Sequence, residues 1–196
     1  MEQENEELLE NIRRSIAGDR EAFARIYDCT VRDVTGTVRF LLEDRASAED
    51  VIQEIYIEIY KSLPKFNPAR SFRSWVIGIA IRQVNNYRRR RWRLFRLLAK
   101  NQQYTSQETE PDFSGEVADR LDSLEVIRLV DNLPYKYKQV IVLRYLYEYS
   151  QEEIARILDI PVGTVKSRLH FALEKLRNIS YTNAYSLGKA GESHGH

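Results

Sequence analysis

The sequence is poor in the residues that build disulfide frameworks, long loops and membrane spans. It contains one cysteine, five prolines and eight glycines in 196 residues. A lone cysteine forms no internal disulfide, and we expect Cys29, which lies in an apolar stretch, to be a buried structural thiol. The longest apolar run, 76–81, is too short to cross a bilayer. The acidic start MEQENEELLENIRR is unlike a secretory signal. We therefore expect a soluble, cytoplasmic protein.

Net charge is also small, at +1, but it is unevenly distributed. Residues 1–100 carry 19 Lys and Arg against 15 Asp and Glu, whereas residues 101–120 carry one arginine against five carboxylates. The basic excess is concentrated at Arg82 and in the run 88–91, and further cations follow it to residue 100. This pattern predicts a polyanionic partner for one face of the molecule and not for the whole surface.

Helical periodicity dominates the patterned segments, so the predicted fold class is all-α. A first helix ends at Gly18, and a second begins near Phe23 and reaches a polar break at 44–47. Ser47, with Asp50 three residues later, is predicted to cap the helix 48–60. A proline-containing loop, 63–71, precedes a long helix from residue 72 to about residue 93.

Residues 101–120 (NQQYTSQETEPDFSGEVADR) are polar, acidic and aperiodic. This composition is typical of a flexible linker. The predicted organisation is therefore two small helical domains joined by an acidic linker. The first spans residues 1–100 and the second 121–180, and residues 181–196 are expected to form a disordered tail.

The segment 150–177 (SQEEIARILDIPVGTVKSRLHFALEKLR) carries the strongest functional signal. Ser150 and Glu153 form the pattern of a capping box, and Pro161 suits the first turn of a second helix. The basic and hydroxyl side chains of that second helix fall mainly off its apolar line: Thr164, Lys166, Ser167, Arg168 and His170. Two short helices with a tight turn indicate a helix-turn-helix that reads DNA. The alternative is an ordinary helical hairpin whose charges are solvated.

The helix 48–60 has one apolar and one acidic side, the latter containing Asp50, Gln53, Glu54 and Glu58. Such a carboxylate cluster suits a divalent cation that supports phosphodiester hydrolysis, a docking face for a basic partner, or a solvated surface. The sequence offers no histidine or second acidic motif that completes a coordination shell. We therefore expect no metal, no cofactor and no catalytic residue.

A second candidate site joins the proline-containing loop to the basic helix. Its members combine aromatic, amide and guanidinium groups: Phe66, Asn67, Arg82, Asn86, Tyr87, Arg88 and Arg89. Arginines hold phosphates and rings stack on bases, so this combination favours single-stranded nucleic acid, including a base turned out of its stack. Phe72 and Trp75 are expected to be core residues. The alternative for the arginine run is a solvated helix end.

The order of these motifs resembles one family. AEDVIQEIYIEIY, then SFRSWVIGIAIRQVNNYRRRR, then the acidic linker and IPVGTVKSRLHFALEKLR are similar to bacterial sigma-70 factors of the extracytoplasmic-function group. The resemblance covers 20–93 and 121–178. It implies that the first domain binds core RNA polymerase, reads the promoter −10 element and separates its strands. It also implies that the second domain reads the −35 element.

The resemblance also implies roles for single residues. Asp50, Gln53 and Glu54 match the face that binds the polymerase, and the loop 65–71 matches the one that captures a flipped base. Asn86 and Tyr87 match positions along the melted strand. An anti-sigma factor, often membrane-bound in this group, is a further implied partner. Arg82 stands where the group often has Asn, and Phe171 stands where it commonly has Arg.

The interpretation is an alternative sigma factor, a non-enzymatic subunit that directs core RNA polymerase to promoters. An alternative is a DNA-binding protein of a different class, a stand-alone helix-turn-helix regulator. That alternative predicts that the free protein binds duplex DNA tightly at a two-fold symmetric site. An enzymatic alternative is a carboxylate-dependent nuclease. That alternative predicts Mg²⁺-dependent cleavage that Glu54→Ala abolishes.

Overall fold

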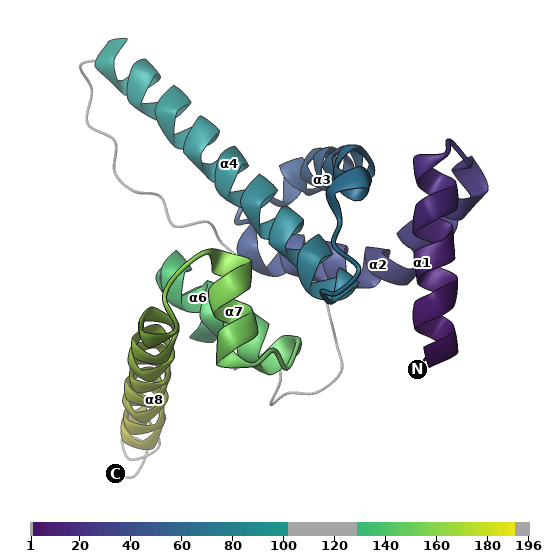
Figure 1. Ribbon diagram of the computed structural model, residues 1–196. Helices are drawn as coiled ribbons and strands as arrows, with labels where there is room; N and C mark the ends of the chain where they lie inside the picture. Colours follow the sequence, from purple (N-terminus) through teal and green to yellow (C-terminus); the bar gives the residue numbers. More distant parts are fainter. Residues whose placement is uncertain (1, 102–128, 191–196) are drawn as a thin grey trace. The chain divides into compact units, whose positions relative to one another are not determined.

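The computed structural model describes residues 2–101 and 129–190, with side chains described over 6–98 and 129–178 (Figure 1). Every regular element in these ranges is helical, which confirms the predicted all-α class. The chain forms two compact units, one built mainly on α1 to α4 and the other mainly on α6 to α8. The predicted linker lies outside the described residues, except for Asn101 at the end of α4. No described helix combines the length and apolarity that a membrane crossing requires.

Helices α1 (Glu2–Ile16) and α2 (Arg20–Leu41) pack against each other across a short turn. Gly18 has φ +97, a left-handed conformation that glycine adopts without strain, so α1 ends where predicted. Asp19 then caps α2, accepting hydrogen bonds from the amides of Glu21 (2.9 Å) and Ala22 (3.1 Å). The Ala22 amide and the Arg14 guanidinium hold the pKa of this carboxyl below its ordinary value.

The turn between α2 and α3 (Ala48–Ser62) contains the 3₁₀ segment η1 (Arg45–Ser47). The prediction that Ser47 caps α3 is wrong, because its side chain makes no capping hydrogen bond there. Asp44 caps η1 instead, accepting from the amide of Ala46 at 3.1 Å. The Ser47 hydroxyl donates to the second oxygen of Asp44 at 3.0 Å, which takes it away from the start of α3.

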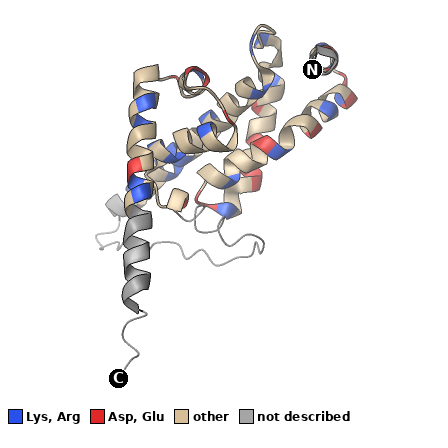
Figure 2. Cartoon of the chain, turned by 90° about the horizontal axis from the view of Figure 1, so that it is seen from below, with Lys and Arg blue, Asp and Glu red and all other residues tan. Residues whose placement is uncertain are grey.

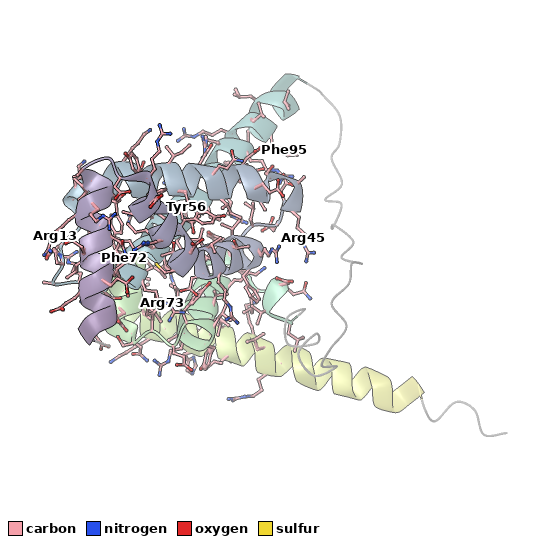
Figure 3. All side chains as sticks on the ribbon, turned by 90° about the vertical axis from the view of Figure 1, so that its right-hand side faces the viewer. Arg13, Arg45, Tyr56, Phe72, Arg73 and Phe95 are labelled. Carbon is pink, nitrogen blue, oxygen red and sulfur yellow. The ribbon has the colours of Figure 1, made fainter. Side chains whose placement is uncertain are left out.

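The core of the first unit is apolar and closely packed, with one polar link inside it. Ile26 of α2, Ile55 and Ile59 of α3 and Ile77 of α4 have no exposed surface. Thr30 and Tyr56 place their hydroxyl oxygens 3.1 Å apart across α2 and α3. Burial raises the pKa of the Tyr56 hydroxyl to about 12. Figure 3 shows Tyr56 and Phe72 among the side chains packed between these helices.

Helix α4 (Phe72–Asn101) follows the 3₁₀ turn η2 (Leu63–Lys65) and its loop. Arg73 links the start of α4 to α2 by a bidentate contact with Asp33, in which Nε lies 2.5 Å from Oδ2 and Nη2 lies 3.1 Å from Oδ1. The helix continues eight residues beyond the predicted end at Arg93, because residues 94–101 contain no proline or glycine to stop it. Its last described turns carry exposed apolar side chains: Trp92, Leu94, Phe95, Leu97 and Leu98.

Cys29 is an exposed residue, so the prediction of a buried structural thiol is wrong. It lies on the outward side of α2, a helix whose apolar stretch made the position look internal. Its Sγ donates to the Ile26 carbonyl at 3.2 Å. Partial burial of the sulfur raises the pKa of the thiol.

The second unit contains α6 (Tyr135–Ile141), the π-helical turn η3 (Val142–Leu146), α7 (Gln151–Leu158) and α8 (Val162–Ala190). Helix α6 packs against α8, and Lys138 of α6 forms an ion pair with Asp131. The Arg144 guanidinium donates a hydrogen bond to the Tyr149 carbonyl at 2.9 Å, which links η3 to the segment just before α7.

The prediction of a disordered tail from residue 181 differs from the structure, in which α8 remains helical to Ala190. Residues 181–187 contain neither proline nor glycine, so their polarity alone does not end a helix. The remainder of that predicted tail, 191–196, lies outside the described residues.

Candidate functional site

The helix-turn-helix begins with the predicted capping box. The amide of Ser150 donates to Glu153 Oε2 at 2.8 Å, and the amide of Glu153 donates to Ser150 Oγ at 3.2 Å. Two backbone donors at the start of α7 are thereby satisfied by local side chains. Both members of the box lie within four residues of each other, so the sequence alone was sufficient to predict it.

The turn between α7 and α8 is short and well defined. Asp159 takes a left-handed φ of 53, and the amide of Ile160 donates to the Ala155 carbonyl at 3.0 Å. The Pro161 carbonyl then accepts from the amides of Thr164 (2.9 Å) and Val165 (3.2 Å). Pro161 thus stands at the entry to α8, as predicted, immediately before the first helical residue, Val162.

Helix α8 separates buried and accessible side chains, but Leu173, predicted to lie on the apolar line with Val165, Leu169 and Leu176, is 39% exposed. Val165, Leu169 and Ala172 are buried. Three of the predicted DNA-reading residues are exposed, namely Lys166, Ser167 and His170. The other two, Thr164 and Arg168, are half-buried. In Figure 2 the positions of Lys and Arg are coloured blue along the described part of α8. This surface combines cations and hydroxyl groups, which hold phosphates and donate to base edges.

Phe171, which was not among the predicted site residues, lies on the same surface. It is 50% exposed, and its ring meets that of His170 edge-on at 5.7 Å between centroids. The signal that finds it is helical spacing, because Phe171 follows Ser167 by four residues and Thr164 by seven.

Helix α4 presents an exposed polar stripe. Arg82, Asn86, Arg89 and Arg93 are separated by four, three and four residues, so they share one face, and all four are exposed. Arg89 donates to Asn86 Oδ1 at 2.8 Å. Arg93 was not among the predicted site residues, although the same spacing identifies it. We call these four residues the α4 stripe.

Tyr87 and Arg91 face a different way, toward the turn between α2 and α3. The Tyr87 hydroxyl lies 2.9 Å from Asp44 Oδ2 and 2.8 Å from Ser47 Oγ. The Arg91 guanidinium reaches the same oxygen of Asp44 at 2.9 Å. The hydrogen bonds from Tyr87 and Ser47, with the Arg91 charge, hold the pKa of the Asp44 carboxyl below its ordinary value.

Two further arginines of the run form ion pairs within the first unit. Arg88 meets Glu43 at 2.6 Å, and Arg90 meets Glu54 of α3 at 2.5 Å. The run of four arginines is therefore divided between two roles. Arg88, Arg90 and Arg91 hold α4 to the preceding elements, whereas Arg89 belongs to the α4 stripe.

The loop before α4 is shaped by its own side chains. Asn67 is exposed, and its Oδ1 accepts from the amide of Ala69 at 2.9 Å, which forms a local turn. Phe66 is half-buried, with its ring centroid 5.1 Å from that of Phe72 and 5.2 Å from that of Trp75. These three rings anchor the loop on the first turn of α4. As predicted for core residues, Phe72 is buried, but Trp75 is only half-buried.

The polar side of α3 places Asp50 and Gln53 at the surface, with Glu54 half-buried beside Arg90. Ile57, one turn after Gln53, is 53% exposed on the same side. Ile57 was not among the predicted site residues, although its spacing from Asp50 and Gln53 places it there. We call Asp50, Gln53, Glu54 and Ile57 the α3 face. Within the described residues, no three His, Cys, Asp or Glu side chains gather closely enough to hold a metal ion.

Both units match protein-family models. Residues 26–94 match Sigma-70 region 2, and residues 123–176 match Sigma-70, region 4. The chain is 34% identical over 180 residues to the ECF RNA polymerase sigma factor SigW of Bacillus subtilis, covering 87% of this chain and 95% of that protein. It is 30% identical over 187 residues to the ECF RNA polymerase sigma-E factor of Escherichia coli K12, covering 87% and 91%.

Solved structures share the fold. One is the sigma factor RpoE in complex with the anti-sigma factor NepR from Bartonella quintana, with a TM-score of 0.65 and 19% identity over 81% of this chain and 96% of that one. Another is CnrH in complex with the cytosolic domain of CnrY, with a TM-score of 0.61 and 21% identity over 88% and 96%. At these sequence identities, the structural similarity establishes a shared helical fold.

Proposed function

Because this chain belongs to the extracytoplasmic-function group of RNA polymerase sigma factors, we propose that its two helical units divide promoter recognition between them. The chain is an alternative sigma factor that directs promoter-specific transcription. In this proposal core RNA polymerase performs the chemistry, and the chain supplies recognition and strand separation. The domain limits at 100 and 121 remain predictions.

The proposal assigns −35 recognition to α8. The helix enters the major groove of duplex DNA and presents Lys166, Ser167, Arg168 and His170, with Thr164 near its start. The support is the agreement of four features: the capping box, the short turn opened by Pro161, the buried apolar line and the accessible cationic surface. This separation of faces is the observation that carries the proposal, because a groove-reading helix needs a free polar side.

The proposal assigns −10 contact to the α4 stripe and to Asn67. Arginines of the stripe hold the phosphates of the separated strand, while the amides of Asn67 and Asn86 meet base edges. Tyr87 and Arg88 were predicted to contact DNA, but their polar ends are engaged within the unit. Their proposed part is therefore to position α4. We propose that Phe66 maintains the conformation of the loop before α4 through its ring contacts with Phe72 and Trp75.

The α3 face is proposed to bind core RNA polymerase. Its carboxylates suit a basic partner surface, and the exposed Ile57 supplies an apolar group at the C-terminal end of that face. A further proposed partner is an anti-sigma factor. The support for that partner is architectural, since two solved structures of this fold are complexes, one of a sigma factor with an anti-sigma factor and one of CnrH with the cytosolic domain of CnrY.

Reconstitution tests the proposal. The full chain should co-purify with core RNA polymerase, and the assembled holoenzyme should produce run-off transcripts from a matching promoter that core polymerase alone does not use. Tight binding of the free chain to a two-fold duplex site, with no polymerase association, would instead support the stand-alone regulator. Mg²⁺-dependent DNA cleavage that Glu54→Ala abolishes would support the nuclease.

A further inference from the structure

Phe171 is a large apolar side chain in the middle of the polar surface of α8. Half of it is accessible to solvent, at 50% exposure. It lies one turn after Ser167 and two turns after Thr164, so the three residues share one face. The ring is held against His170, edge to face at 86°. The helix therefore displays an exposed aromatic ring where charged and hydroxyl groups predominate.

This ring does not belong to a larger apolar patch of α8. The residues around it at helical spacing are polar, namely Ser167, Glu174 and Lys175. The nearest exposed apolar side chain on the described part of the helix, Leu173, is two residues away and therefore on a nearly opposite side. Protein-binding sites expose contiguous apolar areas of several hundred Å². An isolated ring instead suits a single small apolar group within polar surroundings.

The major groove of DNA presents such a group, because the C5-methyl of thymine is an apolar contact among hydrogen-bonding edges. Seven residues of α-helix advance about 10 Å. That distance corresponds to about three base pairs at about 3.4 Å each. A helix that places Thr164 near one base edge therefore carries Phe171 over a base in the same stretch of groove.

We propose that Phe171 contacts the C5-methyl group of a thymine in the −35 element, so that α8 selects thymine at that position. The inference rests on the proposed function, in which α8 enters the major groove. Phe171 would read a methyl group by apolar contact, with no hydrogen bond to the base. The chemical class of the recognised group is thus the 5-methylpyrimidine edge.

The test uses holoenzyme reconstituted from the full chain and core RNA polymerase. Transcription from a promoter library with a randomised −35 element first identifies the preferred sequence. Each thymine is then replaced singly by uracil, which lacks the methyl group but keeps the same hydrogen-bonding edge. At one thymine, uracil should weaken holoenzyme binding about fourfold, the worth of one buried methyl group. In Phe171→Ala this difference should vanish at that position and persist elsewhere, and Phe171→Leu should retain part of it.

The inference is overturned if no thymine is sensitive to uracil, or if the sensitive position responds equally in wild type and Phe171→Ala. Failure of the proposed function gives a different result. In that case Lys166→Ala and Arg168→Ala, tested in the same holoenzyme, would bind duplex −35 DNA as the wild type does. Core-polymerase binding by every variant serves as the control for folding, because α8 takes no part in the α3 face.

Discussion

The hydroxyl of Tyr87 lies 2.9 Å from Oδ2 of Asp44, and this contact joins the middle of α4 to the turn between α2 and α3. The two residues are separated by 43 positions in the sequence. Ser47 and Arg91 meet the same carboxylate oxygen. The carboxylate therefore fixes the rotation of α4 about its axis, and with it the direction in which the α4 stripe faces.

The contact predicts a pH dependence of stability. Asp44 has a folded-state pKa below its ordinary value of 3.8. Its contribution is therefore complete above that ordinary value and is lost as the pH falls through the lowered folded-state value. Asp44→Asn should lower the free energy of unfolding by about 1 kcal/mol at pH 7. The deficit relative to wild type should shrink below about pH 4.

Denaturant unfolding followed by circular dichroism at pH 7, 5 and 3 measures this difference. Tyr87→Phe removes one donor but keeps the carboxylate and its other contacts, so it should retain more of the pH dependence than Asp44→Asn. A deficit for Asp44→Asn that stays constant from pH 7 to pH 3 would contradict the assignment.

A second prediction concerns strand separation by the α4 stripe. Arg89→Ala and Asn86→Ala should slow open-complex formation on a duplex promoter, because phosphate and base contacts to the separated strand are lost. A template already mismatched over the −10 region should largely restore initiation. Permanganate reactivity of unpaired thymines, followed over time, measures the opening step.

The matched control for that experiment is Arg25→Ala, which removes an exposed arginine of α2 away from the stripe. It should open the promoter at the wild-type rate. An equal defect of Arg89→Ala on duplex and mismatched templates would mean that the residue acts in base recognition or in folding, and not in melting.

A third prediction concerns polymerase docking by the α3 face. Asp50→Lys should weaken binding to core polymerase by opposing a basic partner surface, and Ile57→Ala should weaken it by removing the apolar contact. If these residues are among the few that dominate the interface, each change should cost about 1 kcal/mol or more, which is roughly a fivefold change in Kd. Competition against a labelled wild-type chain measures both effects.

Glu6→Lys makes the same charge reversal as Asp50→Lys on an exposed position of α1 and serves as the control. It should bind core polymerase normally. Wild-type affinity of both α3 variants, with unchanged helicity by circular dichroism, would remove the α3 face from the proposed interface.

Local patterns in the sequence predicted local structure well. The Ser150–Glu153 box, the stop at Gly18 and the entry at Pro161 each depend on groups within a few residues. The Ser47 cap failed because Asp44 competes for the same hydroxyl, and that carboxylate is itself held by a residue from α4. Sequence spacing contains no information about such distant partners.

The arginine run shows the same limit at the candidate site. Four consecutive cations predict a polyanion partner, but adjacent helical residues point about 100° apart. Which of them are free depends on where Glu43, Asp44 and Glu54 lie in three dimensions. The sequence spacing was sufficient to identify Arg93 and Ile57. A helical projection alone places Arg93 on the α4 stripe and Ile57 on the α3 face.

The final prediction concerns how Arg168 of α8 contributes to −35 binding. Arg168 is a half-buried residue near the start of the helix, whereas Lys166 is exposed. A bidentate contact to a guanine edge would be worth about 1–3 kcal/mol and would be specific to one base pair. With Phe171 assigned to base contact, we expect Arg168 to hold a phosphate. Arg168→Ala should then weaken binding to every −35 sequence alike and reduce the slope of log affinity against log salt by about 1.

Holoenzyme binding across single-base −35 variants at two salt concentrations distinguishes the two contacts. Relaxed preference at one guanine, with an unchanged salt slope, would assign Arg168 to base readout instead.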